Sequence, residues 1–555
     1  MSIKPCNVLL VSPKFPLNTF WNNKATCRVG GARHSAVPLG LLTVAALLPA
    51  EWTCRLIDRN VRDVTEADLD WADLVMTGGM NVQRLDCLDF IARAQNRGKV
   101  VVVGGPDATS ETHFYARADF IVVGEAEVVI QEFIAAWEAG RRRGTFTAEK
   151  FKVDVTKSPV PRFDLVRRSD YLYFATQFSR GCPFNCEFCD IIELYGRNPR
   201  VKTVAQMLGE LDALYRGGYR GHVDFVDDNF IGNKKAVKAF LPHLVEWQRQ
   251  HDYPFAFSTE ASINLADDDV LLGLMREARF FVVFVGVESP DGDTLVAMQK
   301  KQNARRSLTD SVHKIYRAGM FVIAGFIVGF DTEKGSIADG MVECVEDTAI
   351  PVCMVGLLTA LANTQLTARL EREKRMFPAM WLMDRASERG GGDQCTLGLN
   401  FDTLRPRRDV YADYKSIIDR IYAPRAFFGR VSRVARELRC FWPPRRGGAK
   451  PARRIAGIAL GDWAALMRLF KCVIVEQPLL LGHYIKALRD CARENPGALE
   501  AVATMLAFYL HLGPFSRMVS ASIARQVDEL DDGTWRSPVA SLEAEGEAKK
   551  DPAAA

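Results

Sequence analysis

Short apolar runs alternate with amphipathic segments through the first part of the chain. The apolar runs have the length of strands and cover residues 8–11, 54–57, 74–76, 100–103 and 120–123. Between them, the patterns at residues 39–48, 85–96 and 128–139 repeat with the period of a helix. Short runs that are apolar on both faces and alternate with helices predict a parallel sheet with helices on both sides. We therefore expect residues 1–145 to form an α/β, doubly wound (flavodoxin-like) domain.

A second alternation predicts a barrel in residues 169–370. Six strand-length runs cover residues 173–178, 222–226, 255–259, 281–287, 321–328 and 352–358. Helical patterns separate them at residues 204–215, 235–248, 268–276, 307–318 and 335–347. Six successive βα units predict a partial (βα)6 barrel of the TIM type, in which chemistry takes place at the carboxyl ends of the strands. Residues 146–168, which contain Pro159 and Pro161, are expected to be a linker.

The rest of the chain predicts helices. Residues 371–535 are expected to form a mostly α-helical substrate or lid region, with Tyr411, Tyr414 and Tyr422 in an aromatic-rich lid. The stretch 424–454 carries ten Lys and Arg residues, one acidic residue and interleaved aromatic residues. It is compatible with a membrane-surface contact, with a segment that holds the lid to the barrel, or with a solvated basic face and a Pro/Gly linker. Residues 536–555 are expected to be a disordered tail.

Composition limits the location and the partners. With 48% hydrophobic and 25% charged residues, the chain is typical of a soluble globular protein. A net charge of +4 is too small to indicate nucleic acid binding, and no nucleic acid partner is expected. No apolar run reaches the ~18 residues of a membrane span, and the first residues do not resemble a signal peptide. We expect a cytoplasmic protein, with peripheral contact at the inner face of the membrane as the alternative that the basic stretch suggests.

Three cysteines carry the strongest chemical signal. Cys182, Cys186 and Cys189 follow the first strand of the predicted barrel with the spacing C-x3-C-x2-C. Three thiolates within eight residues can bind three irons of a cubane cluster and leave the fourth iron free for a small molecule. A structural zinc site is the alternative, but it needs four ligands, usually as two spaced pairs, and no second C-x2-C pair follows. Disulfides are not expected, because the thirteen cysteines are scattered and nothing indicates export.

Polar residues follow the later strands of the predicted barrel. Asp227 and Asp228 follow the second strand, Glu260 and Ser262 the third, and Gly286 and Glu288 the fourth. A ligand with an ammonium group, a ribose and an adenine needs carboxylates, hydroxyls and exposed backbone at such positions. The same residue types also cap helices and fill turns, and this structural alternative is open for each of them.

The cysteine motif, with Phe188 directly before its last cysteine, resembles that of the radical SAM family. The resemblance implies a [4Fe-4S] cluster on the three cysteines, with S-adenosyl-L-methionine (SAM) chelated by the free iron. It also implies that residues after the second strand contact the methionine part of SAM and that the turn after the fourth strand contacts the ribose. Carried over to this chain, the SAM-binding residues are Phe188, Asp227, Asp228, Glu260, Ser262, Gly286 and Glu288.

Glycine-rich turns follow three strands of the N-terminal domain. They are Thr77-Gly78, Gly104-Gly105-Pro106 and Gly124-Glu125, where glycine allows a ligand to approach the backbone, although such glycines are also ordinary turn residues. These turns resemble those of the cobalamin-binding domain that precedes the barrel in one class of radical SAM enzymes. Residues 58–63 lack the histidine of the cobalamin-ligating Asp-x-His-x-x-Gly motif. The absence of this histidine is typical of that class. A degenerate domain without cobalamin is the alternative.

Together these features resemble the class B, cobalamin-dependent radical SAM methyltransferases, and most of all the bacterial hopanoid C-2 methylases. The resemblance implies methylation of an unactivated carbon, through a 5'-deoxyadenosyl radical and methylcobalamin, on a lipid such as a hopanoid. It also implies an external low-potential electron donor of the flavodoxin or ferredoxin type. Two alternatives are open: another cobalamin-dependent enzyme, such as an oxidative cyclase or a natural-product methylase, and a non-catalytic iron-sulfur electron carrier.

Overall fold

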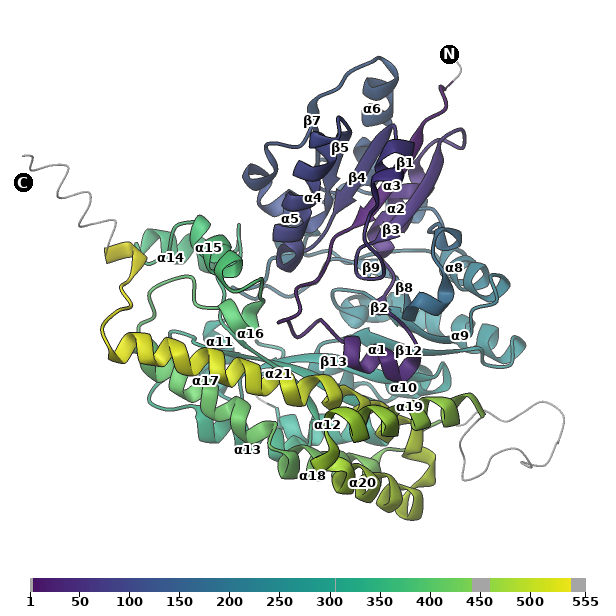
Figure 1. Cartoon of the computed structure of the whole chain (residues 1–555). Helices are drawn as coiled ribbons and strands as arrows, with labels where there is room; N and C mark the ends of the chain where they lie inside the picture. Colours follow the sequence, from purple (N-terminus) through teal and green to yellow (C-terminus); the bar gives the residue numbers. More distant parts are fainter. Residues whose placement is uncertain (1–2, 305, 442–459, 541–555) are drawn as a thin grey trace, which may run out of the picture.

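The computed structural model describes residues 3–304, 306–441 and 460–540. Two parallel sheets dominate it (Figure 1). The N-terminal sheet stands over one end of a curved barrel sheet, and long helices from the C-terminal part of the chain lie along the barrel (Figure 1). This arrangement confirms the predicted fold class, an α/β protein with a helical C-terminal region.

The N-terminal sheet has the strand order β3-β1-β4-β5-β6-β7, and all its strands are parallel. The strands are β1 (Asn7–Ser12), β3 (Thr53–Asp58), β4 (Leu74–Gly78), β5 (Val100–Gly104), β6 (Phe120–Val123) and β7 (Gly144–Thr147). The chain passes to one side of β1 and then to the other, which is the flavodoxin-like order with a ligand crevice at the carboxyl ends of the strands. The first five are the predicted strands, whereas β7 is an edge strand without an apolar run.

Alternate residues of each strand enter two separate cores, one on each face of this sheet. On one face, Leu10 and Met76 pack with α2 (Leu39–Leu47) and α6 (Ala126–Glu138). On the other face, Val75 packs with α3 (Glu66–Trp71) and α4 (Arg84–Asn96). Helices on both faces are the expected solution for strands that are apolar on both sides.

The barrel sheet has the order β15-β14-β13-β12-β11-β8-β2, and its strands are also parallel. Its strands are β2 (His34–Ala36), β8 (Tyr171–Thr176), β11 (Gly221–Phe225), β12 (Phe255–Glu260), β13 (Phe280–Glu288), β14 (Phe321–Val328) and β15 (Val352–Leu357). The connecting helices include α8 (Val204–Arg216), α9 (Lys234–Gln250), α10 (Asp269–Glu277), α12 (Leu308–Arg317) and α13 (Ala338–Thr348). The six predicted strands of the partial barrel are all present.

The seventh strand of the barrel sheet comes from the N-terminal part of the chain. Residues 15–37 leave the first sheet, form α1 (Lys24–Gly30), and then add β2 beside β8. The hydroxyl of Thr26 donates to the carbonyl of Ala507 at 3.1 Å, and the amide of Phe20 donates to Asp393 at 2.7 Å. The N-terminal segment therefore lies between the barrel and the C-terminal helices, an excursion that the sequence pattern does not predict.

The chain after the barrel is helical. Its helices are α14 (Gln365–Arg372), α15 (Met380–Glu388), α16 (Gln394–Leu397), α17 (Arg407–Ile421), α18 (Pro424–Glu437), α19 (Leu460–Glu476), α20 (Leu481–Glu494) and α21 (Leu499–Asp531). The Tyr414 hydroxyl shares its proton between the carbonyls of Val355 and Cys395, and Tyr422 bonds to the backbone of Cys353. These tyrosines, which the sequence analysis assigned to a lid, are buried and attach α17 to the edge strand β15.

The described half of the basic stretch is an interior helix. Phe427 and Phe428 on α18 are buried, and the guanidinium of Arg430 donates to the carbonyl of Ile350 at 2.9 Å and pairs with Glu346. This packing supports the second of the three predicted roles, in which the segment holds the C-terminal region to the barrel. Residues 442–459 of the stretch, and residues 541–555 of the predicted disordered tail, lie outside the described residues.

One helical stretch of the described chain, residues 496–531, is long and apolar enough to cross a membrane, and its most apolar 18-residue window has a mean hydropathy of 1.3. Its most apolar window is 67% buried inside the protein, where α21 packs against α17 and α1. Burial of this kind is typical of a core helix.

Candidate functional site

The three cysteines lie in a loop at the carboxyl end of β8. A short antiparallel pair, β9 (Ser179–Arg180) and β10 (Arg200–Val201), closes the base of this loop. Gly181 has a φ of +100°, and a Cβ there would lie 2.8 Å from the carbonyl oxygen of Gly196, so this position requires glycine. The amide of Cys182 donates to that same carbonyl at 3.2 Å. The loop is therefore fixed at its first cysteine.

The surroundings of the thiols suit an iron-sulfur cluster. The side-chain amide of Asn229 donates to the sulfur of Cys182, and that of Gln302 donates to the sulfur of Cys186, each at 3.8 Å. Hydrogen bonds to sulfur stabilise the anionic thiolate state that a cluster needs.

Asp227 and Asp228 hold the cysteine loop. The carboxylate of Asp227 accepts hydrogen bonds from the amides of Phe178 (2.9 Å) and Ser179 (2.5 Å) and from the Ser179 hydroxyl. Asp228 accepts one from the amide of Gly181 at 2.8 Å. Both oxygens of Asp227 are thus occupied by the protein, which gives this residue a positioning role. Asp228 retains one oxygen for a ligand, and burial raises its pKa to about 6.

Asn229 follows Asp228 in the turn after β11 and is not among the residues that the sequence analysis assigned to SAM. Besides the bond to Cys182, its side chain exchanges hydrogen bonds with Ser262, whose amide donates to the Asn229 oxygen at 3.2 Å. It thereby connects the turn after β11 to the turn after β12 and to the cluster loop. Its place beside Asp228 in the same turn was the available signal.

The turn after β13 brings a cation next to the cluster loop. Glu288 has a φ of +65° and pairs with Lys300, whose ammonium lies 5.7 Å from the ring centroid of Phe188. A Cβ on Gly286 would lie 2.7 Å from the nitrogen of Lys300, so glycine is needed for this approach. Three of the predicted SAM residues, Phe188, Gly286 and Glu288, therefore meet at one place, together with a lysine that sequence reasoning missed.

Glu260 stands at the end of β12. Its carboxyl group has no hydrogen-bond partner among the described residues, and it is accessible. Enclosure by the barrel wall, and then the carboxylates of Asp224, Asp228 and Asp227, raise its pKa to about 8. A positively charged ligand group would relieve this repulsion, which is the environment expected for a residue near the sulfonium or ammonium of SAM.

The glycine turns of the N-terminal sheet lie side by side at its carboxyl edge. A Cβ on Gly78 would overlap the carbonyl oxygen of Gly104, and Gly105 and Gly124 have φ values of +89° and +88°. In contrast, a Cβ on Gly104 would meet only Val122, at 3.4 Å. The turns thus leave bare backbone at a switch-point edge, as a large flat ligand requires.

Two of the predicted cobalamin residues have structural roles within this domain. The hydroxyl of buried Thr77 donates to the carbonyl of Val11 at 2.9 Å, so it points into the sheet. Pro106 lies in the first turn of α5 (Gly105–Ser110), where proline suits the start of a helix.

Glu125 joins the N-terminal sheet to the cysteine hairpin. Its carboxylate accepts from Arg180 at 2.9 Å and from Arg200 at 2.8 Å, and Arg180 also donates to Glu127 at 2.7 Å. All four side chains are largely buried. Glu125 therefore contacts the barrel, and the two candidate cofactor sites are connected through it.

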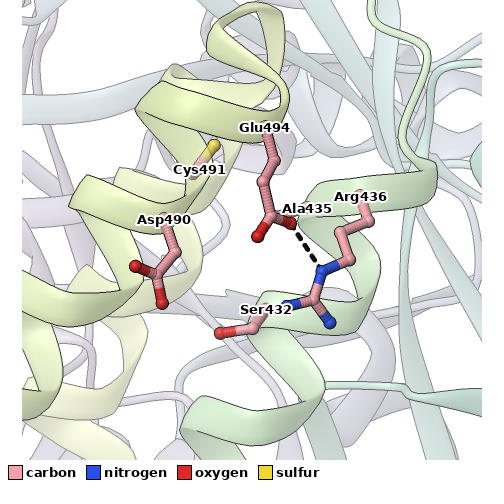
Figure 2. A pocket seen from close by; sticks show the side chains of 6 residues that line it. All are labelled: Ser432, Ala435, Arg436, Asp490, Cys491 and Glu494. Carbon is pink, nitrogen blue, oxygen red and sulfur yellow. Dashed lines mark hydrogen bonds and ion pairs between the residues drawn. The ribbon is translucent and has the colours of Figure 1, made fainter.

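The C-terminal helices contain a further small hollow between α18 and α20 (Figure 2). It is lined by Ser432, Ala435, Arg436, Asp490, Cys491 and Glu494. The ion pair between Arg436 and Glu494, at 2.6 Å, spans it, and no room remains for a small molecule. The candidate active site is instead formed by the cysteine loop and the glycine turns, at the carboxyl ends of the strands of the two sheets.

Comparison with known proteins agrees with this geometry. Residues 176–343 match the Radical SAM superfamily, and residues 364–525 match a domain of unknown function (DUF4070). An uncharacterized methyltransferase of Synechocystis sp. is 42% identical over 521 residues, which cover 94% of each chain. The hopanoid C-2 methylase of Rhodopseudomonas palustris is 39% identical over 397 residues, 71% of this chain and 72% of the relative.

Solved structures share the fold. The cobalamin-dependent SAM radical enzyme OxsB, with aqua-cobalamin bound, superposes with a TM-score of 0.55 at 15% identity, over 98% of this chain and 84% of that one. The radical SAM methyltransferase TsrM from Kitasatospora setae gives a TM-score of 0.53 over 67% of this chain and 78% of that one.

The chain belongs to the radical SAM methyltransferases. Its relatives include the hopanoid C-2 methylase. Membership makes the protein an enzyme and brings a [4Fe-4S] cluster and SAM, as the sequence analysis predicted; cobalamin, which the OxsB and TsrM structures contain, is a proposal for this chain. The electron-carrier alternative is thereby set aside.

Proposed function

We propose that this enzyme methylates an unactivated carbon of a hopanoid-type polycyclic lipid, at C-2. The observation that carries the proposal is the 39% identity to a hopanoid C-2 methylase over 71% of the chain. The alignment is too long to reflect a barrel alone, since the radical SAM match covers only residues 176–343. When bound, the cluster with SAM supplies a radical that activates the C–H bond, and cobalamin supplies the methyl group.

The proposed cluster ligands are Cys182, Cys186 and Cys189, supported by the amide groups of Asn229 and Gln302. Their loop is held in place by the carboxylates of Asp227 and Asp228 from β11. A fixed loop keeps the three sulfurs at the separations that a rigid cluster requires.

The proposed SAM contacts lie around that loop. They are Phe188, Asp228, Glu260, Ser262, Gly286 and Glu288, with Lys300 added from the structure. Asp228 and Glu260 offer carboxylate oxygens to an ammonium or sulfonium, and Glu288 offers the oxygen that does not face Lys300 to a ribose hydroxyl. Asp227, from the same turn, is proposed to act through the loop.

The proposed cobalamin surface consists of the backbone at Gly78, Gly104, Gly105 and Gly124. Thr77, Pro106 and Glu125 are proposed to support this edge through contacts within the protein. Because Glu125 also binds Arg180 and Arg200, the cobalamin surface and the cluster loop are held in one register. The Asn363 amide, which donates to the carbonyl of Ser110 at 3.1 Å, makes a second connection between the barrel and this domain.

Another substrate of the same chemistry is the second candidate. The relative that aligns over 94% of the chain is an uncharacterized methyltransferase, and the family also includes bacteriochlorophyllide d methyltransferases of Chlorobaculum tepidum at 22% and 23% identity. Both candidates need a low-potential electron donor of the flavodoxin or ferredoxin type. They differ in the body of the substrate, a saturated polycycle or a tetrapyrrole.

The test is an anaerobic reaction with the full chain, reconstituted with iron, sulfide and cobalamin, and supplied with SAM and a low-potential reductant. A bacterial hopanoid extract is added, and mass spectrometry follows the lipids. We expect one methyl group to be added to the hopanoid, with 5'-deoxyadenosine and S-adenosylhomocysteine formed in step. Deoxyadenosine without a methylated lipid would exclude the hopanoid and leave the second candidate.

Two variants make the assay specific. Cys186→Ala is expected to abolish deoxyadenosine formation, because one iron loses its thiolate. Cys344→Ala, on the barrel helix α13, removes a thiol that lies outside the loop and is expected to leave the reaction unchanged. Wild-type activity in Cys186→Ala would overturn the cluster assignment.

A further inference from the structure

The apolar surface of this protein is concentrated at one place. Of the exposed large apolar side chains, five fall within residues 467–485 on α19, the turn η8 (Pro478–Leu480) and α20: Met467, Ile474, Val475, Leu479 and Ile485. The remaining ones are scattered singly along the chain. Isolated exposed apolar residues are normal, whereas a group of them marks an interaction surface.

These side chains share one face because of helix periodicity. Along α19, Met467 lies four residues before Lys471, and Ile474 and Val475 lie three and four residues after it. The opposite side of α19, with Leu469 and Val473, is buried, where the helix packs against α1 and α21. The exposed apolar side chains therefore lie on the side of α19 that faces away from the rest of the protein.

The same separation holds for α20. Figure 2 shows Glu494 of α20 facing Arg436 of α18, and Tyr484 and Leu488 of α20 are buried. Ile485, Lys486 and Arg489 are exposed. The two helices contact each other and the turn η8 between them, and their exposed side chains are here called together the α19–α20 face.

The shape of this face favours a fluid partner. Leu479, at the turn between the helices, is 95% exposed, and Val475 is 71% exposed. A leucine that projects so far needs a matching pocket in a protein partner, because specific interfaces are packed as densely as protein interiors. The boundary between headgroups and acyl chains accepts a projecting apolar side chain without such complementarity.

Charges around the face favour an anionic surface. Arg28, Lys471, Lys486 and Arg489 border it, together with the acidic residues Glu476 and Asp490. Glu476 pairs with Arg28, and Asp490 is shared by Lys486 and Arg489. Lys471 has no acidic partner within the described part of the chain, so the border is cationic on balance. Cations beside inserted apolar residues bind anionic headgroups.

We propose that the α19–α20 face docks the enzyme on the surface of an anionic phospholipid bilayer. The purpose of this contact rests on the proposed function, because a hopanoid-type substrate resides in a membrane. Leu479 and Val475 enter the headgroup region, and Lys471, Lys486 and Arg489 contact phosphates. The site differs from the one suggested by the sequence, since the aromatic residues of α18 are buried.

The test measures binding to vesicles without any substrate. Full-length, cluster-reconstituted protein is sedimented with vesicles of phosphatidylethanolamine and phosphatidylglycerol in equal amounts, and with vesicles of phosphatidylcholine alone. We expect partition into the anionic vesicles that falls with added salt. The double variant V475S/L479S is expected to lower the partition coefficient by roughly tenfold or more, and Lys471→Gln to lower it only on anionic vesicles.

The matched control is Leu404→Ser, which removes a side chain that is 67% exposed on a loop outside this face. It is expected to partition like the wild type. Wild-type protein that stays in solution with both vesicle types would overturn the proposal, as would a V475S/L479S variant that binds normally. A wild-type dimer that V475S/L479S converts to a monomer, with no vesicle binding, would overturn it in favour of a second copy of the chain.

A separate assay keeps the two proposals apart. V475S/L479S and the wild type are compared for methylation of a hopanoid extract dispersed in detergent, where membrane docking is not needed. We expect equal rates there. Vesicle binding without methylation by either protein would reject the proposed substrate and keep the docking surface, whereas equal methylation without vesicle binding would do the reverse.

Discussion

The guanidinium group of Arg180 lies 2.9 Å from the carboxylate of Glu125 and 2.7 Å from that of Glu127. Arg180 stands two residues before the first cysteine of the cluster loop, and Glu125 directly follows the glycine turn at Gly124. Together with Arg200, which also pairs with Glu125, Arg180 therefore joins the two half-sites. Buried ion pairs lie between the cysteine loop and the proposed cobalamin surface.

Arg180→Met is expected to uncouple these two half-sites. The change leaves two buried carboxylates short of a partner, which costs about 3–5 kcal/mol of unfolding free energy. In protein loaded with both cofactors, pulsed EPR between the reduced cluster and cob(II)alamin should show a broader distance distribution. Deoxyadenosine should then form in excess over methylated product.

Arg97→Met is the control for that experiment, because Arg97 makes a two-bond pair with Asp70 at the exposed surface. Its removal should change the unfolding free energy by about 0–1 kcal/mol and leave the distance distribution unchanged. An Arg180→Met enzyme with an unaltered distance distribution would show that the ion pair does not set the spacing.

Asp227→Asn is expected to lower the cluster content. An amide has one acceptor oxygen, so its NH2 group would face a backbone amide of Phe178 or Ser179 and leave a buried donor unsatisfied, at a cost of about 1–3 kcal/mol. The measurement is the number of irons per chain after reconstitution, with thermal unfolding in parallel. Asp224→Asn, on the strand β11 that precedes the turn of Asp227, is the control, since Asp224 accepts from the hydroxyl of Ser258 and an amide oxygen can do the same. A full cluster with weakened SAM binding in Asp227→Asn would instead make Asp227 a direct SAM contact.

Gly104→Ala separates ligand binding from folding. The new methyl group meets only Val122, at 3.4 Å, and the unfolding free energy should stay within about 1 kcal/mol of the wild type. Cobalamin affinity, measured by absorbance titration, should fall by roughly tenfold or more, because the methyl group stands where the ligand approaches the backbone. Gly78→Ala is expected to destabilise the fold itself, since its methyl group would overlap the Gly104 carbonyl. Unchanged cobalamin affinity in Gly104→Ala would remove this edge from the binding surface.

His511 makes stability depend on pH. Its Nε2–H donates to the carbonyl of Phe20 at 3.1 Å, its ring stacks on Phe515, and burial lowers its pKa to about 4. Between pH 6.5 and 4 the unfolded chain binds a proton that the folded chain does not, so stability falls as the pH falls, by up to about 3 kcal/mol. Urea unfolding at about pH 7.5 and about pH 5 should therefore show a smaller pH-dependent loss in His511→Gln, which keeps an N–H donor. An equal loss in both proteins would mean that His511 does not contribute.

Most strands of the two sheets could be predicted because they are short, mainly apolar runs that alternate with helical patterns. The strand β2 could not, since residues 34–36 include His34 and Ser35, and its partner β8 lies far along the chain. A short polar segment forms a strand only when it can pair with the edge of an existing sheet. The residue pattern within the segment does not indicate whether such an edge is nearby.

The roles of polar residues show the same limit. Sequence reasoning placed Asp227 and Glu125 near cofactors, and both do lie next to the candidate sites. Their hydrogen bonds, however, go to the cysteine loop and to Arg180. The spacing along the chain identifies which turns meet at a site, whereas the partner of each carboxylate depends on packing between segments that are distant in sequence.

The position of the N-terminal segment sets the order in which the molecule can be completed. Thr26 and Ala507, which share a hydrogen bond, are 481 residues apart in the chain. During synthesis, α1 and β2 leave the ribosome long before α21, against which α1 packs. The face of α1 that packs against α21 therefore stays uncovered until α21 has been made. Truncation at either terminus should consequently leave the same surface exposed to chaperones, although the two ends belong to different parts of the sequence.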